Sequence, residues 1–453
     1  MNTNKNTESK VGEVLSARQG EPKNVVAFGA TSFCNDTASE MAYWILPAFL
    51  TSIGAGPAAL GIIEGIAESV TSLAKLASGY LSDKVPRKKP IVVAGYAVAN
   101  AVKPLLAIAG AWWHVLLIRF ADRLSKGIRG APRDVMVTES AAPGRTGSAF
   151  GLLQSMDSAG AIAGPLLALA ILPAFGFRGV FVAAAIPGAL AVVAVTVFVR
   201  ERRSAVSDDN ASKIVAAKQE VESEIYANVS ADARFDAVPA TTLTGSTRRS
   251  KFPAQFYYVL FAVALFSIGN SSDMFLVLRA QSIGIPAAHA PLLGLVFNVT
   301  YTLFSWPAGK LSDALAAVNA RSDTNEGRPD RRRRMPRHAI AAAGYLVFAA
   351  TYVVFGLAPS RWAIWVMMAL YGLYYALTAP VLKAIVAEAV PREIRGRAFG
   401  VFAFVTSVTT LLASVITGAL WKQFGPAVPF LVSAGLAGIS AMMLLAVRRS
   451  EHD

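Results

Sequence analysis

Long apolar runs alternate with short polar connections along almost the whole chain. Each run has about 20 residues and few charges, which is the length that crosses a hydrocarbon core of ~30 Å. Six lie in each half, near residues 26–50, 59–82, 90–111, 114–136, 147–172 and 179–199 and near 255–280, 291–312, 338–357, 362–386, 397–420 and 427–447. The pattern predicts an all-α integral membrane protein with twelve transmembrane helices.

Polar segments divide this pattern into two bundles. Residues 200–253 are mixed in charge, rich in Ala, Ser, Asp and Thr, and lack a pattern that could build a core. We therefore expect a cytoplasmic N-terminal tail (1–25), a six-helix bundle (26–199), a cytoplasmic linker (200–253), a second six-helix bundle (254–447) and a cytoplasmic tail (448–453).

Composition supports a membrane protein, because 54% of the residues are hydrophobic and 16% are charged. The net charge of +14 does not indicate nucleic-acid binding, because the basic residues lie between the spans rather than in one patch. They follow the even-numbered spans, as at Lys84, Arg87, Lys88, Lys89, Arg145, Arg200, Arg202, Arg203 and Arg331 to Arg334. By the positive-inside rule, both termini are predicted to be cytoplasmic, with the chain in a bacterial inner (plasma) membrane.

Enzyme chemistry is not indicated. The only cysteine, Cys34, lies in the first span, which excludes an intramolecular disulfide and a cysteine-based metal site within one chain. The sequence has no nucleophile–base pairing, metal-ligand cluster or phosphate-binding glycine loop. We expect no enzyme activity, no metal and no cofactor, and a monomer whose partners are lipid and a small-molecule substrate.

An internal repeat relates the two halves. Gly79-Tyr-Leu-Ser-Asp83 at the end of span two returns as Gly309-Lys-Leu-Ser-Asp313 at the end of span eight. Ala131-Pro132 followed by Glu139 is matched by Ala379-Pro380 followed by Glu388. Two pseudo-symmetric bundles joined by a linker are typical of a transporter that alternates access by rocking one half against the other.

Span four carries a stripe of basic residues. At ~100° per residue, Arg119, Arg123, Lys126 and Arg133 fall within about 80° of one another, and Arg129 lies beside them. Because a charge near the bilayer centre costs several kcal/mol unless it faces protein or water, this stripe is predicted to face inward.

Carboxyl groups in other spans could carry the coupling proton. Such a group must be neutral in one facing state and ionised in another. Glu40 and Glu68 fit this role best, with Asp36, Asp157 and Asp273 as further candidates. The alternative is that these charges only neutralise one another and hold the first half together. The second half has fewer embedded charges: Asp273, Arg279, Lys383 and Glu388.

The repeated motif resembles one in the major facilitator superfamily, and the resemblance covers nearly all of the chain except the termini and the linker. The family places Gly, three residues, Asp and a basic turn after span two, as Gly79 to Lys89 do here, with Pro86 where Gly is usual. The resemblance implies that Asp83 pairs with cations at a helix N-terminus of the opposite half and latches one conformation. The predicted latch residues are Gly79, Asp83, Arg87, Gly309 and Asp313.

Two further motifs are similar to those of this family. Arg123-Leu-Ser-Lys126-Gly127 looks like its Arg-x-x-Gln-Gly pattern, with Lys126 replacing Gln. Gly160-Ala-Ile-Ala-Gly164-Pro165 is similar to part of its antiporter signature, with Ala168-Leu169 in place of the paired glycines that follow. Generic helix packing is the alternative explanation for these small residues. We expect the small residues to let helices of the two halves pack closely and Pro165 to bend its span.

A central cavity between spans one, four, seven and ten is the predicted substrate site. Its candidate contacts are Tyr43, Trp44, Tyr371, Tyr374 and Tyr375, together with Asn298, which the repeat aligns with Glu68. Lipid contact is the alternative for the aromatic residues.

The motifs favour a secondary transporter that resembles bacterial drug or metabolite:proton antiporters and exports a small organic compound, with the proton gradient as its energy source. One alternative is proton-coupled uptake of an anionic metabolite, which an unpaired span-four stripe facing the cavity would favour. Another is a membrane sensor that no longer transports and signals through residues 200–253.

Overall fold

The structure is a computed structural model, and it describes residues 22–43, 45–55, 57–201, 252–286, 290–325, 336–357 and 360–446. The chain divides into two compact units, Met1–Arg200 with Phe252–Asp453, and Glu201–Lys251. Beyond Glu201 the second unit, which is most of the predicted linker, lies outside the described residues. So do Trp44, Arg331 to Arg334, the predicted C-terminal tail and most of the N-terminal one.

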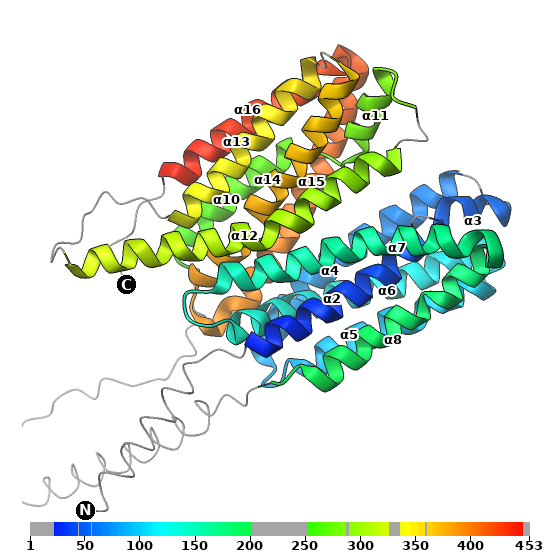
Figure 1. The fold of residues 1–453 in the computed structure, drawn as a ribbon, viewed down its shortest axis with the longest axis horizontal. Helices are drawn as coiled ribbons and strands as arrows, with labels where there is room; N and C mark the ends of the chain where they lie inside the picture. The colour runs from blue at the N-terminus through cyan, green and yellow to red at the C-terminus, as the bar shows by residue number, and fades with distance from the viewer. Residues whose placement is uncertain are drawn as a thin grey trace, which may run out of the picture. The chain divides into compact units, whose positions relative to one another are not determined.

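The first half contains the helices coloured blue to green in Figure 1. They are α2 (Pro22–Tyr43), α3 (Leu46–Ser52), α4 (Pro57–Lys84), α5 (Lys89–Val102) with the 3₁₀ turn η1 (Lys103–Ile108), α6 (Trp112–Ser140), α7 (Thr146–Ala183), α8 (Ala185–Val193) and the π-turn η2 (Ala194–Phe198). Helix α7 is two helices joined at Gly176, whose φ of 62° is a left-handed conformation that favours glycine. The predicted boundary between spans five and six falls at this turn.

The second half follows the same order. It contains α10 (Ala254–Gly269), α11 (Met274–Ser282), α12 (Ala290–Asn325), α13 (Pro336–Leu357), α14 (Arg361–Glu388), the turn η4 (Arg392–Ile394), α15 (Arg395–Phe424) and α16 (Ala427–Ala446). The described residues form helices, turns and connections without a strand, so the prediction of an all-α chain is confirmed.

Spans one and seven are each broken into two helices, where the apolar pattern predicted continuous ones. The first break separates α2 from α3, and Pro47 in the first turn of α3 has no N–H to continue the earlier helix. The second separates α10 from α11 at Asn270–Asp273. The two breaks occupy equivalent places in the two halves, and broken helices of this kind line the binding sites of many transporters.

Six helical segments of the described chain are long and apolar enough to cross a membrane: Lys89–Ile108, Thr146–Phe198, Arg337–Leu357, Arg361–Glu388, Arg392–Phe424 and Ala427–Ala446. The highly charged helices α4 and α6 are not among them. These segments support a membrane protein, while the number of spans stays a prediction.

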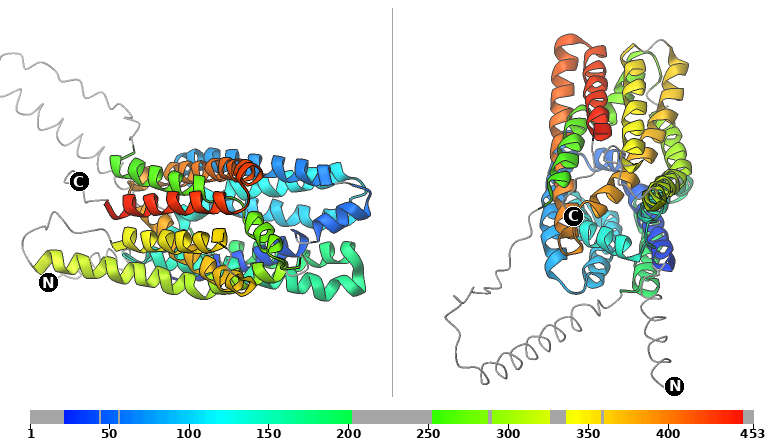
Figure 2. Two further views of the ribbon diagram at one scale, coloured as in Figure 1. Left: turned by 90° about the horizontal axis from the view of Figure 1, so that it is seen from above. Right: turned by 90° about the vertical axis from the view of Figure 1, so that its left-hand side faces the viewer.

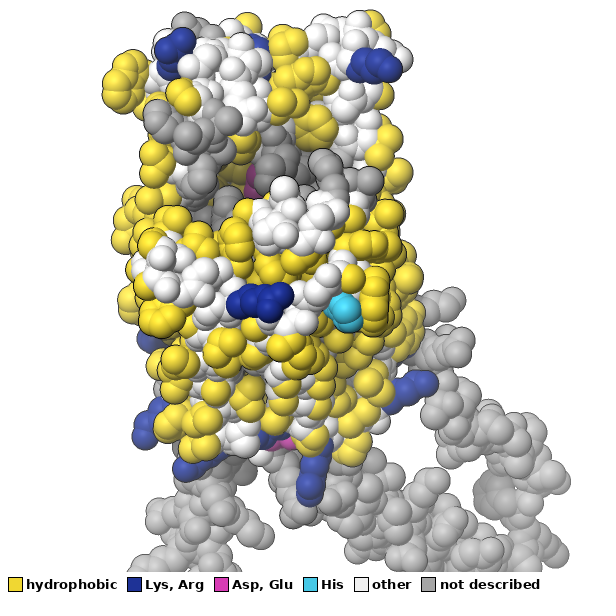
Figure 3. Space-filling model, turned by 90° about the vertical axis from the view of Figure 1, so that its right-hand side faces the viewer, with side chains coloured by type: hydrophobic (Ala, Val, Ile, Leu, Met, Phe, Trp, Pro, Cys, Tyr) yellow, Lys and Arg dark blue, Asp and Glu magenta, His cyan; other side chains and the backbone are white. Residues whose placement is uncertain are grey.

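The two halves meet through two equivalent helix pairs, α4 with α15 and α7 with α12 (Figure 2). An apolar cluster containing Phe150, Val386 and Phe399 joins the halves near the ends of these helices that carry the repeated motifs. The ring centroids of Phe150 and Phe399 are 5.9 Å apart. At the end that carries α3 and α11, the surface is hollowed between the halves and an acidic side chain is visible in the hollow (Figure 3). The halves are therefore closed at one end and parted at the other.

Candidate functional site

The first half holds a network of ion pairs between α4, η1 and α6. Arg119 of α6 binds Glu64 of α4 at 2.7 Å and lies 3.7 Å from Asp122. Lys103 of η1 approaches Asp122 at 3.8 Å. Arg119, Asp122 and Lys103 are each at most 7% exposed. Their mutual neutralisation makes the burial of these charges tolerable, and loss of one partner would leave an uncompensated charge.

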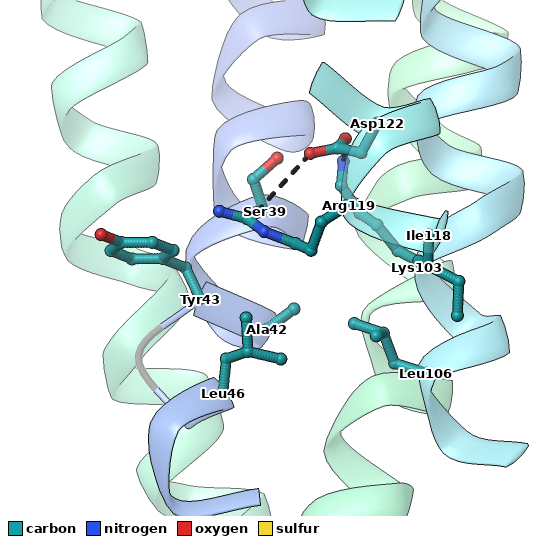
Figure 4. A pocket seen from close by; sticks show the side chains of 9 residues that line it. All are labelled: Ser39, Ala42, Tyr43, Leu46, Lys103, Leu106, Ile118, Arg119 and Asp122. Carbon is teal, nitrogen blue, oxygen red and sulfur yellow. Dashed lines mark ion pairs between the residues drawn. The ribbon is translucent and has the colours of Figure 1, made fainter. Parts of the chain in front are cut away.

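A small pocket lies beside this network. In Figure 4 the Arg119 side chain lies between Tyr43 and Asp122, and the Arg119 guanidinium is 5.3 Å from the centre of the Tyr43 ring. About 10 Å³ of the pocket is open to the centre of a water molecule, which is room for about one water. Tyr43, a predicted substrate contact, thus borders a pocket beside the ion-pair network.

Sequence reasoning missed Lys103 and Asp122. Lys103 Nζ also binds Asn100 Oδ1 at 2.9 Å, and Asn100 donates to Asn35, which donates to Asp36 at 2.9 Å. A polar chain therefore links this network to a predicted coupling residue. The sequence could have pointed to Lys103, because a single lysine within an apolar run is unusual in a membrane span.

The remaining basic residues of α6 differ in their surroundings. Arg129 is 5% exposed and stacks over Tyr96 at 4.1 Å, and Arg133 lies 3.3 Å from Asp134. In contrast, Arg123 and Lys126 form no ion pair with any described residue. Arg123 is half-buried and Lys126 is exposed. The predicted stripe is thus neutralised at Arg119 and Arg133 and left without ion pairs between them.

Three acidic residues gather where α2 packs on α7. Asp157 of α7 is half-buried, and its Oδ1 atom is buried without a hydrogen-bond partner in the described part of the chain. Asp36, Arg133 and Lys383 are among the charged groups that act on it. Glu40 lies one turn along α2 from Asp36, beside Gly164. Glu68 lies in α4, but the Glu68 side chain is outside the part of the chain that the structure describes.

The packing motif joins helices of one half, which corrects the expectation that it joins the two halves. A Cβ atom on Gly160 would lie 2.6 Å from the carbonyl oxygen of Phe33, and one on Gly164 would lie 2.7 Å from that of Thr37. Both carbonyls belong to α2. Residue spacing identified the close approach but could not identify the partner helix. Pro165 lies inside α7, one residue after Gly164.

The second half contributes an acid at the break between α10 and α11. Asp273 accepts a hydrogen bond of 2.8 Å from Tyr371, which also contacts Asn270 at 3.4 Å. Asn270 in turn donates to Tyr374 at 3.3 Å. Asp273 is exposed and has no ion pair within the described ranges, while Tyr371 and Tyr374 are buried. Tyr371 therefore presents its hydroxyl group to the acid, while the Tyr374 hydroxyl contacts the neighbouring Asn270.

The remaining cavity candidates of the second half are less buried. Tyr375 and Phe297 are half-buried and pack at 5.2 Å between ring centroids. Asn298 is half-buried and donates to the Gly294 carbonyl of its own helix at 3.0 Å.

Asp83 lies at the N-terminus of α15 in the opposite half. It accepts hydrogen bonds from the backbone N–H groups of Gly396 at 2.7 Å and Arg397 at 2.9 Å, and from the Arg397 side chain at 3.0 Å. A carboxylate at a helix N-terminus is stabilised by the unpaired N–H groups and the helix dipole. Gly79 permits this contact because a side chain there would strike the α15 backbone. Arg87 is exposed, and it is the neighbouring Lys88 that pairs with Glu139 at 3.7 Å.

Asp313 repeats this arrangement at the N-terminus of α7. It accepts hydrogen bonds from the N–H groups of Gly147 at 2.9 Å and Ser148 at 2.7 Å. Arg337 of α13 binds Asp313 at 2.7 Å and Glu388 of α14 at 3.0 Å. Gly309 is in close contact with Gly147, as Gly79 is with Gly396.

A third charged contact joins the halves between these two. Lys383 of α14 binds Asp134 of α6 at 2.9 Å, and Asp134 is 8% exposed. The sequence pointed to Lys383 as an embedded charge but not to Asp134.

The model of the Major Facilitator Superfamily matches residues 28–322 and 259–453. The chain belongs to this superfamily. An uncharacterized MFS-type transporter of Methanocaldococcus jannaschii is 31% identical over 435 residues, which cover 93% of this chain and 94% of that protein. The resemblance inferred from the motifs is thereby confirmed.

The chain is also similar to part of an efflux pump in sequence and to a solved transporter in fold. The multi-drug resistance efflux pump PmrA of Streptococcus pneumoniae is 29% identical over 173 residues, which cover 37% of this chain and 42% of the pump. The crystal structure of the human organic anion transporter MFSD10 superposes with a TM-score of 0.67 at 15% identity and covers 94% of this chain and 99% of that one. At this identity, the structural likeness shows the fold alone.

Membership of the superfamily makes this chain a membrane transporter by fold and family. The roles assigned to the latch, coupling and cavity residues stay predictions, for which the distances above now give a geometry.

Proposed function

We propose that the protein exports a small organic compound across the plasma membrane in exchange for protons. Export is supported by the similarity to a multi-drug resistance efflux pump over part of the chain. Proton coupling is carried by one observation, the Asp157 carboxyl with a buried Oδ1 atom that has no hydrogen-bond partner among the described residues. A carboxyl in such a place can serve as a proton site, because protonation changes its interactions with every neighbouring charge.

The position of Asp157 suggests how a proton could change the conformation. Lys383 belongs to the second half, binds Asp134 of the first half and also acts on Asp157. Ionised Asp157 adds to the negative charge that holds Lys383 against the first half. Protonation removes that contribution, which weakens the contact between the halves at the closed end and favours opening there. A proton taken up from the hollowed side is then released on the other side, as antiport requires.

The test uses inverted membrane vesicles with an acidic interior. Addition of an exported compound should dissipate the pH gradient in wild type but not in Asp157→Asn, which cannot exchange a proton. The mutant should still exchange labelled for unlabelled compound, because that reaction needs no net proton movement. Glu393→Gln, at an exposed acid in the turn η4, is the matched control and should behave as wild type.

The same vesicles evaluate the other coupling candidates and the direction. Glu40→Gln, Glu68→Gln and Asp273→Asn are measured beside Asp157→Asn, and proton movement that survives in Asp157→Asn but fails in one of these would reassign the proton site. If the compound moves in the same direction as the protons, proton-coupled uptake is favoured over export. Arg123 and Lys126, which lack ion pairs among the described residues, give that alternative its support through an anionic substrate.

A further inference from the structure

We infer that the transported compound carries a carboxylate or similar anionic group, which binds Arg123 and Lys126 on the inner face of α6. This inference rests on the proposed transport function and specifies the substrate class of the central cavity predicted between spans one, four, seven and ten.

The basic residues of α6 differ in how far their charges are balanced. Arg119 is neutralised by Glu64 and Asp122, and Arg133 lies against Asp134. Arg129 is buried over Tyr96 and donates to the Gly95 carbonyl at 3.4 Å. Arg123 and Lys126 have neither a carboxylate in an ion pair nor an aromatic ring beneath the charge within the part of the chain that the structure describes. These two cations without an ion pair are neighbours on α6, and Asp36 and Asp122 act on Lys126 only from beyond ion-pair distance.

Lys126 lies on the inner face of α6. At ~100° per residue, Lys126 projects from the same face of α6 as buried Arg119 and from nearly the opposite face to Leu117, which is 60% exposed. The exposure of Lys126 is therefore exposure to the interior between the halves rather than to lipid. An unpaired charge at this depth is tolerable only where water or a ligand can reach it.

The spacing of Arg123 and Lys126 suits a single anionic group. Residues three apart lie side by side on a helix, so two cations share one patch and repel each other when it is empty. A carboxylate between them removes that repulsion and can accept two parallel hydrogen bonds from the Arg123 guanidinium. A Gln at position 126, as in the motif that this segment resembles, would give a hydrogen bond without the charge. Lys126 thus makes the patch an anion site in this chain.

The second half offers a group of opposite charge, the carboxylate of Asp273. Asp273 is exposed and has no ion pair among the described residues, so a ligand recognised mainly by this half would be a cation. The two possibilities predict opposite preferences, and compounds that share one aromatic body but differ in charge can separate them.

The experiment measures binding to the purified full-length protein in lipid nanodiscs by isothermal titration calorimetry, with 1-naphthoate, 1-naphthamide and 1-naphthylmethylamine. Wild type should bind the naphthoate at least about tenfold more tightly than the amide, a factor expected for one charge-assisted contact. Lys126→Gln should reduce that ratio to about threefold or less, while Lys126→Arg, which keeps the charge, should preserve it. Lys422→Gln, at an exposed residue in the last turn of α15, should leave all three affinities unchanged.

Three results would overturn the inference: equal affinities for the three compounds, tightest binding of the amine, or no binding of the naphthoate. Because no proton gradient is present, failure of proton-coupled export in vesicles leaves this measurement intact. The failure of one proposal is therefore distinguishable from the failure of the other.

Discussion

Lys383 of the second half and Asp134 of the first form an ion pair of 2.9 Å that crosses between the bundles. The pair is unequal, because Asp134 also lies 3.3 Å from Arg133, whereas Lys383 makes no second ion pair among the described residues and acts on Asp157 only from a greater distance. It lies on the helices between the two motif contacts, at the end where the halves are closed. Its strength should therefore set how readily that end opens.

Asp134→Asn is predicted to loosen the closed end more than Lys383→Met. The Asn variant leaves a partly buried lysine without its carboxylate, and removing one member of a buried pair costs on the order of 3–5 kcal/mol. The Met variant leaves Asp134 with Arg133. Hydrogen–deuterium exchange in the first turns of α7 and α15 should rise more in Asp134→Asn. Equal exchange in the two variants, or exchange unchanged from wild type, would contradict an asymmetric inter-bundle contact.

Gly79→Ala is predicted to prevent full closure between α4 and α15. The new Cβ atom would lie 2.6 Å from the Gly396 carbonyl oxygen and 2.8 Å from Gly400 Cα, both of which are backbone atoms of the opposite half. We expect the transport rate to fall by about tenfold or more, which is the effect of ~1.4 kcal/mol on an equilibrium. Hydrogen–deuterium exchange around Gly396 should become faster.

Gly65→Ala is the matched control for this change. Gly65 is in the same helix, and a Cβ there meets no atom within 4 Å. Both substitutions gain the same helix propensity, so only contact with α15 differs. Similar transport by the two variants would show that the close approach at Gly79 has no role in the cycle.

Arg279→Lys is predicted to lower stability without changing transport per folded molecule. The Arg279 guanidinium donates to the carbonyl oxygens of Phe355 and Gly356, each at 2.9 Å, and so satisfies the last turn of α13. A lysine cannot reproduce this fork, and we expect a loss on the order of 1–3 kcal/mol in unfolding free energy. Thermal melting in detergent measures it. Arg361→Lys, at a more exposed arginine that makes one such contact with Ile283, should lose less. Transport lost at normal stability would instead make Arg279 a functional charge.

The sequence predicted positions along helices better than partners between them. The repeat placed Asp83 and Asp313 in equivalent contexts, and the structure places each at a helix N-terminus of the opposite half. Periodicity predicted the inner face of α6. It could not predict that Lys103 would share Asp122 with Arg119, because the Lys103 contact depends on how η1 approaches α6.

The breaks in spans one and seven show the same limit. Apolar composition runs through both, so the pattern contains no signal for a break beyond Pro47 in the first and Asn270 in the second. Tyr371 was predicted from its aromatic character alone. Its hydroxyl contact with Asp273 depends on the α10–α11 break that brings the acid to α14.

An anionic substrate exchanged for a proton has a measurable electrical consequence. Outward movement of one negative charge and inward movement of one proton transfer two charges in the same electrical direction, so each 100 mV of potential contributes about 4.6 kcal/mol per cycle. One-for-one uptake of the same anion with a proton transfers no net charge. In proteoliposomes with a potassium-diffusion potential, transport of 1-naphthoate should accelerate with voltage and generate a current, and Lys126→Gln should reduce both together. Transport that is indifferent to voltage would exclude this exchange and would favour the uptake alternative, even if the naphthoate binds at Arg123 and Lys126.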